Sequence, residues 1–194
     1  MLAAAAGAVV SVGLSVSEAD AQGAAFRRGA VSGENGAAAR SGRAFTNGQG
    51  SGFVRRGGAA TDGQGNGFAG RGGCASGASG SGCRGGATTW GSDGSVSRRS
   101  GTEYSGDNGS VSSRGSFNRD ADGNTTGSRS TDASGASGSY SGSSSVENGA
   151  YNRGGVYTGS DGQSATVDST YQRGEGGSRT VTCTDASGAV VACP

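Results

Sequence analysis

The sequence lacks most of the residue types that carry enzymatic chemistry. It has 16 basic residues and no His, and because it also has no Lys, every basic residue is Arg. Ser-His and Cys-His catalytic pairs, Schiff bases and phosphate-loop lysines therefore cannot be built. Asp120 and Asp122 form a carboxylate pair, but two acids act as a glycosidase only where a pocket separates their pKa values. Large apolar residues that could form a pocket are scarce, so we predict a protein that is not an enzyme and has no cofactor.

The same region has a partial calcium-loop pattern. Asp120, Asp122 and Asn124 place oxygens at the first, third and fifth positions of such a loop. Its sixth position is normally Gly and its twelfth Glu, whereas this chain has Thr125 and Thr131 there. Turn formation explains the Asp residues more simply, so we expect no metal site.

The four cysteines form two local pairs, Cys74 with Cys83 and Cys183 with Cys193. Paired zinc ligands are usually separated by two to four residues, and these pairs are separated by eight and nine. We therefore predict two disulfides rather than a zinc site, which favours an oxidising compartment.

Residues 1–21 contain the one long apolar stretch, which ends in Ala19-Asp20-Ala21, the small-x-small pattern of a cleavage site. No positive charge precedes it. We predict a signal peptide and a secreted or cell-surface protein, with no membrane contact after cleavage. A helix of the mature protein and a membrane anchor are the alternatives.

Arg-Gly-Gly occurs four times and resembles the RGG boxes that bind RNA; it begins at Arg56, Arg71, Arg84 and Arg153. Such segments need a positive field to contact phosphates. Here 16 basic and 15 acidic residues leave a net charge of +1. Nucleic acid is therefore not an expected partner, and a disordered RGG-type nucleic-acid-binding linker stands only as an alternative.

The composition excludes a conventional core. The chain has 43 Gly and 32 Ser, while beyond residue 21 its large apolar residues are ten Val, five Phe, five Tyr and one Trp. Their burial cannot offset an ordering entropy of about 1–2 kcal/mol per residue. Order must come from backbone hydrogen bonds, turns, disulfides or assembly.

Two kinds of turn signal recur with a period of about 14 residues. Asn-Gly and Asp-Gly, the favoured loops of β-hairpins, form the first kind. They stand at Asn35-Gly36, Asn47-Gly48, Asp62-Gly63, Asp93-Gly94, Asn108-Gly109, Asp122-Gly123, Asn148-Gly149 and Asp161-Gly162, while a ninth, Asn66-Gly67, falls out of phase. The second kind is Arg closely followed by Gly, at Arg56, Arg71, Arg84, Arg99, Arg114, Arg153 and Arg173. If both kinds turn the chain, the strands between them are about four to six residues long.

Val and aromatic residues flank these turns at matched distances. The predicted cross-strand pairs are Val96–Tyr104, Tyr104–Val111, Val111–Phe117, Val146–Tyr151 and Tyr151–Val156, each centred on a predicted turn. Pairs of this kind contribute about 0.2–1 kcal/mol each.

We therefore predict an all-β fold, a Gly/Ser-rich β-meander of short antiparallel strands; the alternatives are a β-solenoid and a largely disordered chain. A solenoid would stack like-charged arginines about 4.8 Å apart, which favours the meander. Four segments are expected: the signal peptide (1–21), a Gly/Ala/Arg-rich low-complexity segment with weak repeats (22–89), the hairpin repeats (90–180) and a disulfide-clasped hairpin (181–194).

The predicted function is that of a secreted structural repeat protein, a self-assembling subunit of an extracellular fibre, surface layer or biofilm matrix. Its main partner would be itself, because exposed strand edges gain stability by joining copies. The alternative from another class is a flat Ser/Thr-rich module that binds surface polysaccharide or ice.

Overall fold

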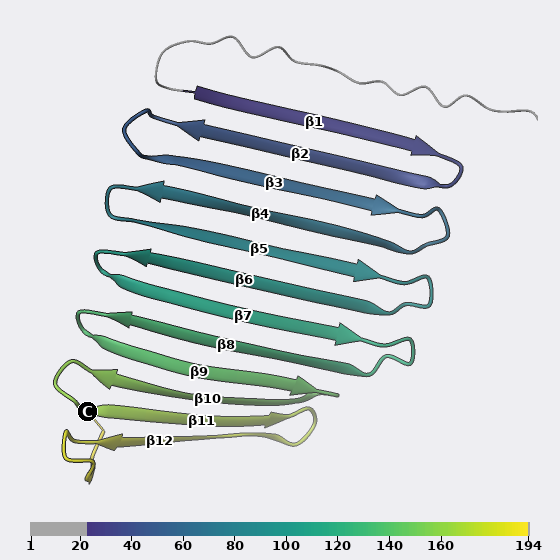
Figure 1. Cartoon of the computed structure of the whole chain (residues 1–194). Coiled ribbons are helices and arrows are strands. Elements are labelled where there is room, and N and C mark those ends of the chain that lie inside the picture. The colour runs from purple at the N-terminus through teal and green to yellow at the C-terminus, as the bar shows by residue number, and fades with distance from the viewer. Residues whose placement is uncertain (1–22, 194) are drawn as a thin grey trace, which may run out of the picture.

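In a computed structural model, residues 23–193 form one antiparallel sheet (Figure 1). Every strand pairs with its neighbours in the chain, so the strand order in the sheet follows the sequence from β1 to β13. The predicted all-β meander is therefore confirmed, and the solenoid and the disordered chain are excluded. The structure describes residues 23–193; the predicted signal peptide lies outside them.

Twelve strands have 9 to 11 residues, and the last has two. They are β1 (Gly23–Gly33), β2 (Gly36–Thr46), β3 (Gly52–Thr61), β4 (Gly67–Gly77), β5 (Gly80–Trp90), β6 (Val96–Gly106), β7 (Gly109–Arg119), β8 (Thr125–Gly135), β9 (Gly138–Glu147), β10 (Ala150–Gly159), β11 (Ser164–Gln172), β12 (Gly176–Thr184) and β13 (Val190–Val191). This part of the chain has no helix, so none is long and apolar enough to cross a membrane.

The Asn-Gly and Asp-Gly dipeptides lie in or beside the connections, as predicted. The glycines of the eight in-phase dipeptides have φ angles between 71° and 129°, a region that Gly adopts without steric cost, whereas Gly67 of the out-of-phase Asn66-Gly67 opens β4 without a positive φ. Asn148 and Gly149 both have positive φ, 46° and 89°, which matches the type I′ turn of a two-residue hairpin. In the β6–β7 hairpin, the two-residue loop is Asp107-Asn108, and Gly109 opens β7.

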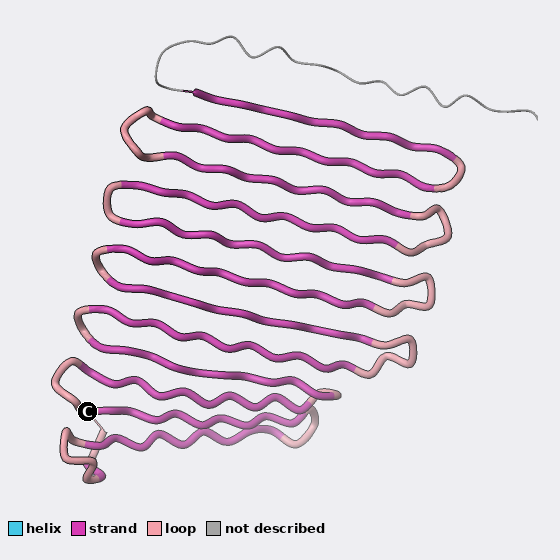
Figure 2. The backbone as a smooth tube through the Cα atoms, in the orientation of Figure 1, coloured by secondary structure: helices cyan, strands magenta, loops and turns pink. Residues whose placement is uncertain are grey.

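The second class of turn is wrong for six of its seven members. Six of these arginines lie within strands: Arg56, Arg71, Arg84, Arg99, Arg114 and Arg153. Of the seven, only Arg173 lies in a turn. Figure 2 shows that the strands run without a break between the connections at the two margins. The glycines beside these six arginines are not among those with positive φ. Gly next to Arg therefore gives space within a strand instead of a turn, and the strands are about twice as long as predicted.

The sheet is a single layer without a core. Among the described residues only Cys183 and Ser113 are buried, at 8% and 6% exposure. No second layer covers either face in Figures 1 and 2. The backbone ladder and side-chain pairs between neighbouring strands therefore hold the fold together.

The low-complexity segment belongs to the same sheet as the hairpin repeats. Residues 23–90 form β1 to β5, and β5 pairs with β6 along its whole length. At the other end, β13 pairs with the last two residues of β12, Cys183 and Thr184.

Candidate interaction surfaces

The strand register assigns each strand residue to one of two faces. Directly opposite residues of an antiparallel ladder point to the same side, and successive residues of a strand point to opposite sides. Following the partners through the sheet places ten of the eleven aromatic residues and ten arginines on one side. We call this side the arginine–aromatic face and the other, rich in Ser and Thr, the hydroxyl face.

Aromatic residues of the arginine–aromatic face gather in rows near the margins of the sheet. One row holds Phe45, Phe53, Tyr104, Val111, Tyr140 and Tyr157. A row nearer the opposite margin holds Phe117, Val146, Tyr151 and Tyr171. The rings of Phe45 and Phe53 stack with centroids 6.0 Å apart. Such rings stay largely accessible, since Tyr104 is 40% and Tyr171 52% exposed.

Most arginines of this face lie between those two rows. Each strand from β1 to β8 contributes one, as do β10 and β12: Arg28, Arg43, Arg55, Arg71, Arg84, Arg98, Arg119, Arg129, Arg153 and Arg179. Arg71 stands between Gly57 and Gly86 on the neighbouring strands. Arg129 stands between Gly115 and Ser144. Small neighbours leave these side chains exposed.

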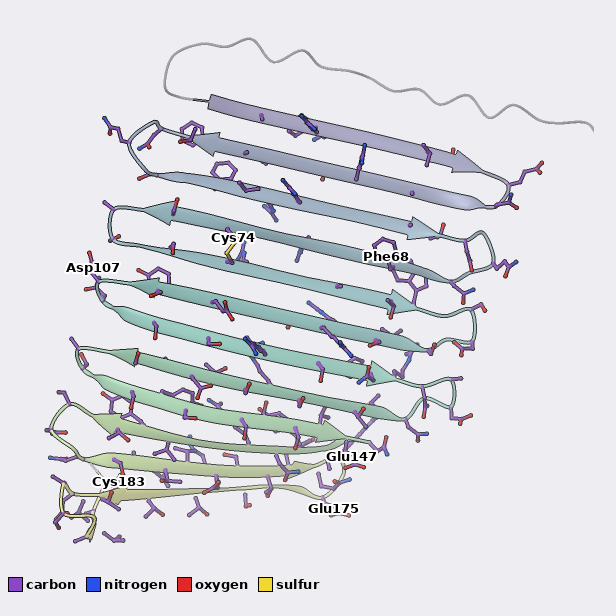
Figure 3. All side chains as sticks on the ribbon, viewed as in Figure 1. Phe68, Cys74, Asp107, Glu147, Glu175 and Cys183 are labelled. Carbon is purple, nitrogen blue, oxygen red and sulfur yellow. A yellow bond between two sulfur atoms is a disulfide. The ribbon has the colours of Figure 1, made fainter. Side chains whose placement is uncertain are left out.

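Carboxylates are kept away from the arginine–aromatic face. The described strands carry four, and all belong to the hydroxyl face: Glu103, Asp132, Glu147 and Asp168. The other nine carboxylates of residues 23–193 lie in the connections along the two margins, where Figure 3 labels Asp107 and Glu175. Charges that nearly cancel in the sequence are thus separated in space.

Hydrogen-bonded Ser and Thr pairs between strands are more numerous on the hydroxyl face than on the arginine–aromatic face, where Ser113–Thr131 (2.9 Å) is such a pair. The pairs of the hydroxyl face are Ser110–Ser134 (2.9 Å), Ser116–Ser128 (3.0 Å), Ser164–Thr184 (2.6 Å) and Thr170–Ser178 (2.8 Å). Arg114 and Glu103 form an ion pair of 3.0 Å on this face, the one ion pair among the described residues. Because both side chains are well exposed, this pair contributes little to stability.

Two large rings of the arginine–aromatic face lie over glycines. A Cβ at Gly67 would come within 2.7 Å of Cε2 of Trp90. A Cβ at Gly155 would come within 2.7 Å of the Tyr140 hydroxyl, which also covers Gly142. Glycine at these strand positions therefore makes room for a neighbouring ring.

Asp and Asn side chains close the longer connections. Asn47, Asp62 and Asp185 each accept, through Oδ1, the backbone N–H groups two and four residues later, at 2.8–3.0 Å. Side-chain hydrogen bonds from the same loop, supported by backbone N–H groups, stabilise the carboxylate form. They hold the pKa below its usual value at Asp62, Asp93, Asp120 and Asp185.

The candidate calcium loop is closed by its own hydrogen bonds. Asn124 donates from its backbone N to Asp120 Oδ1 and from Nδ2 to Asp120 Oδ2, both at 2.8 Å. Across residues 23–193 no group of three or more His, Cys, Asp or Glu side chains is placed to hold a metal ion. Both carboxylate oxygens of Asp120 thus serve the turn.

The register brings together two of the five predicted Val–aromatic pairs. Tyr104 lies opposite Val111, and Val146 lies opposite Tyr151. The other three predicted pairs are wrong, because the arginine between their members does not turn the chain. Each of those pairs lies within one strand: Val96 and Tyr104 in β6, Val111 and Phe117 in β7, Tyr151 and Val156 in β10. Val156 even lies on the hydroxyl face, opposite Ser141 and Thr166.

Both predicted disulfides are present. Cys74 and Cys83 lie directly opposite each other on β4 and β5, with Cα atoms 4.0 Å apart, on the hydroxyl face (Figure 3). Cys183 of β12 is joined to Cys193, with Cα atoms 5.3 Å apart. Two disulfides and no free thiol among the described residues are compatible with an extracellular location.

Shallow grooves cross the described sheet. One of about 1010 Å³ lies over β3 to β6 and is lined by Arg55, Arg71, Arg84 and Arg98, with Arg129 of β8 at its end and Gly73 and Gly82 between them. Another, of about 1080 Å³, crosses the middle of the sheet from β5 to β11; Gly and Ser line most of it, together with Arg99, Arg114, Arg129, Arg153 and Asp168.

Sequence reasoning missed the arginine–aromatic face. One signal for it was visible: the carboxylates of the repeats cluster at the Asx-Gly turns, whereas the arginines lie midway between them. The side to which an arginine points depends on the register, which composition does not contain. Comparison with known proteins finds no match for this chain among protein-family models, curated proteins or solved structures.

Proposed function

We propose that this protein is a self-assembling structural subunit of an extracellular fibre, surface layer or matrix, whose copies join edge to edge. The observation that carries the proposal is that both edges of the sheet are open. All residues of β1 are exposed, and β1 pairs with β2 alone among the described strands. At the other edge, β13 covers only the last two residues of β12. Unpaired edge strands are templates for another chain.

The number of long strands suits continuation by simple translation. Twelve long strands alternate in direction, so β12 runs antiparallel to β1. A second copy in the same orientation would place its β1 antiparallel beside β12 and keep equivalent faces on the same side. Such a head-to-tail contact does not close on itself and gives an open filament.

The lack of a core supplies a physical reason for assembly. A single-layer sheet buries little apolar surface on its own, and its large side chains stay partly exposed. Joining edges adds ladder hydrogen bonds and side-chain pairs on both faces at once. The two disulfides support the extracellular part of the proposal, because disulfides persist in oxidising compartments.

Electron microscopy and fibre diffraction of the purified protein test the proposal. We expect filaments with a reflection near 4.8 Å along their axis, the spacing between strands. A monodisperse monomer in sedimentation velocity at high concentration would contradict it.

Proline variants at the start of β1 localise the contact. Successive N–H groups of an edge strand point alternately to the partner strand and to the open edge. Ala24→Pro and Ala25→Pro each remove one N–H group, and one of these two groups points to the open edge. The variant that loses this outward N–H should stop filament growth. Its monomer should keep the circular dichroism spectrum of a β protein. Filament growth by both variants at the wild-type rate would exclude the β1 edge.

A further inference from the structure

We propose that the arginine–aromatic face binds an acidic polysaccharide, a chain of uronic acid sugars lying across the strands on the arginine track. The inference goes beyond self-assembly, because the face is available in a single copy. Its basis is the combination of ten arginines, the absence of strand carboxylates from that side and a groove lined by five of these arginines.

The arginines of this face have no acidic partner within the described residues. The one ion pair, Arg114–Glu103, belongs to the hydroxyl face. Where the face arginines contact other groups, the partners are neutral. Arg129 donates to Ser113 Oγ at 3.1 Å, Arg119 donates to Gly94 O at 2.9 Å, and Arg28 lies 4.6 Å from the ring centroid of Phe26. Their positive charge is therefore left for a ligand from outside.

The arginines form a band that crosses the strands. Arg28, Arg71, Arg129, Arg153 and Arg179 share one row of the register, Arg43, Arg55 and Arg84 share the adjacent row, and Arg98 and Arg119 lie nearer one margin. A linear polymer with regularly spaced anionic groups can contact several of them together. The planar fork of a guanidinium matches a carboxylate with two parallel hydrogen bonds, which makes a polyuronate a suitable occupant.

Part of this arginine track lies in a depression, the groove over β3 to β6. Arg55, Arg71, Arg84 and Arg98 rise beside it, and Gly73 and Gly82 leave its floor low. Neither glycine has room for a Cβ without a close contact: at Gly73 it would stand 2.6 Å from Val54 O, and at Gly82 2.9 Å from Glu103 O. Any larger residue at these two positions would therefore raise the floor of the groove and shift its strands.

The same charges exclude a second copy from this face. Two arginine–aromatic faces brought together would oppose ten positive charges to ten without intervening carboxylates, which is unfavourable at any dielectric constant. Assembly through the edges instead extends the arginine track from one copy to the next.

The positions of the aromatic rings favour an acidic polysaccharide over single-stranded nucleic acid as the ligand. Nucleic-acid platforms stack bases on aromatic rings that stand within the basic track. Here the central row with Arg71, Arg129 and Arg153 contains no ring, and of the ten rings on this face only Phe26 and Phe117 stand directly opposite an arginine. The disulfides favour a compartment outside the cell as well.

Adjacent arginines on opposite faces provide a matched test. R28Q/R55Q/R98Q removes three charges from the arginine–aromatic face, and R27Q/R56Q/R99Q removes three from the hydroxyl face of the same strands β1, β3 and β6. Binding to immobilised polygalacturonate is measured by biolayer interferometry with the full chain at several salt concentrations, beside dextran and oligo-dT. We expect the first variant to bind about tenfold or more weakly and with a shallower salt dependence, because fewer counterions are released.

Several results would overturn the proposal. Equal losses in both variants would mean that net charge alone drives binding, and tighter binding to oligo-dT than to polygalacturonate would make nucleic acid the ligand. Absence of polygalacturonate binding would also reject it. The edge variant that stops filament growth should still bind polygalacturonate, so the failure of one proposal does not decide the other.

Footprinting on the unaltered protein keeps the test independent of variant folding. Phenylglyoxal modifies accessible arginines, and mass spectrometry reports each site. Polygalacturonate should protect Arg55, Arg71 and Arg98 while leaving Arg56 and Arg99 reactive. Equal protection of both groups would contradict the assignment to one face.

Discussion

The two faces of the sheet share one backbone ladder but are stabilised by different side-chain pairs. On the arginine–aromatic face, rings and valines meet across strands, as Tyr104 with Val111 and Val146 with Tyr151. On the hydroxyl face, Ser and Thr form hydrogen-bonded pairs such as Ser116 with Ser128. Neither face has a second layer, so each side must supply its own contacts between neighbours.

The difference between the faces shows how a chain with almost no net charge forms a sheet with one strongly positive face. The net charge of +1 contains no hint that ten arginines share one side. The alternation of side chains along strands and the carboxylates placed in the connections create the separation. Net charge is thus a poor guide to binding for a single-layer sheet, whose whole surface is two faces and a rim.

The largest expected effect comes from the disulfide on the hydroxyl face. Cys74→Ser with Cys83→Ser should lower the free energy of unfolding by about 2–3 kcal/mol, the loop-closure contribution of a short loop. Cys183→Ser with Cys193→Ser should instead release mainly β13, which pairs with only two residues. Urea unfolding and hydrogen exchange measure the two effects. A global loss from the second variant equal to that from the first would show that the sheet end controls its stability.

A smaller effect is expected where a glycine accommodates a ring. Gly67→Ala should lower the free energy of unfolding by about 1–3 kcal/mol, because the new Cβ would collide with Trp90 and with Ala60 O. Gly101→Ala on the hydroxyl face is the matched control, since the nearest atom to its new Cβ would be Ser113 O at 3.7 Å. That change should stay within about 0.5 kcal/mol. Equal losses at both positions would mean that ring accommodation does not distinguish the faces.

Double-mutant cycles compare the side-chain pairs of the two faces directly. Tyr104→Ala with Val111→Ala should give a coupling energy of about 0.2–1 kcal/mol, as cross-strand aromatic–aliphatic pairs do. Ser116→Ala with Ser128→Ala should give about 0.5 kcal/mol or less, because the exposed hydroxyls can bond to water instead. Urea midpoints of the four single and two double variants provide both values. A larger coupling for the serine pair would reverse the proposed order of the two faces.

The meander and its Asx-Gly turns could be predicted from the sequence because they depend on local chemistry, whereas the Ala-Ser loops at 78–79 and 136–137 carry no such signal. Asn148-Gly149 specifies a tight hairpin through its dihedral angles alone, and the spacing of Cys74 and Cys83 suggested a local bridge. Strand length could not be predicted, because a glycine can serve either to turn the chain or to leave space. Gly149 does the first and Gly154, beside Arg153, does the second.

The assignment of each side chain to one face or the other could not be predicted from the sequence, for a related reason. A shift of one residue in register moves every side chain of a strand to the other side. The connections of this sheet range from the two residues of Asp107-Asn108 to the five of 120–124, so the side of each arginine follows from loop geometry. Arg98 and Arg99 are neighbours in the chain and belong to different faces.

The smallest expected effect concerns the acidic rim beside the arginine–aromatic face. Hydrogen bonds from Asn66 and from backbone amides lower the pKa of Asp62 from its usual 3.8. A lowered pKa means that the carboxylate stabilises the fold fully above its ordinary pKa and loses that contribution as the pH falls through the lower value. Stability should therefore decline in acid below about pH 4.

Asp62→Asn isolates this effect, because Asn47 shows that an amide oxygen can accept the same two backbone N–H groups. The variant should be slightly less stable than the wild type at pH 7, because the hydrogen bond from Asn66 Nδ2 to Asp62 Oδ2 is lost, and it should lose less further stability between pH 4 and pH 2, as measured by thermal melts across that range. Asp62 is fully exposed, so the change should be small, and the decline should shrink stepwise as Asp120 and Asp185 are replaced as well. An acid decline that stays unchanged in the triple variant would assign it to other carboxylates, either Asp93 of the rim or the four on the hydroxyl face. Replacing Asp93 next would then decide whether acid acts on the rim or on one face of the sheet.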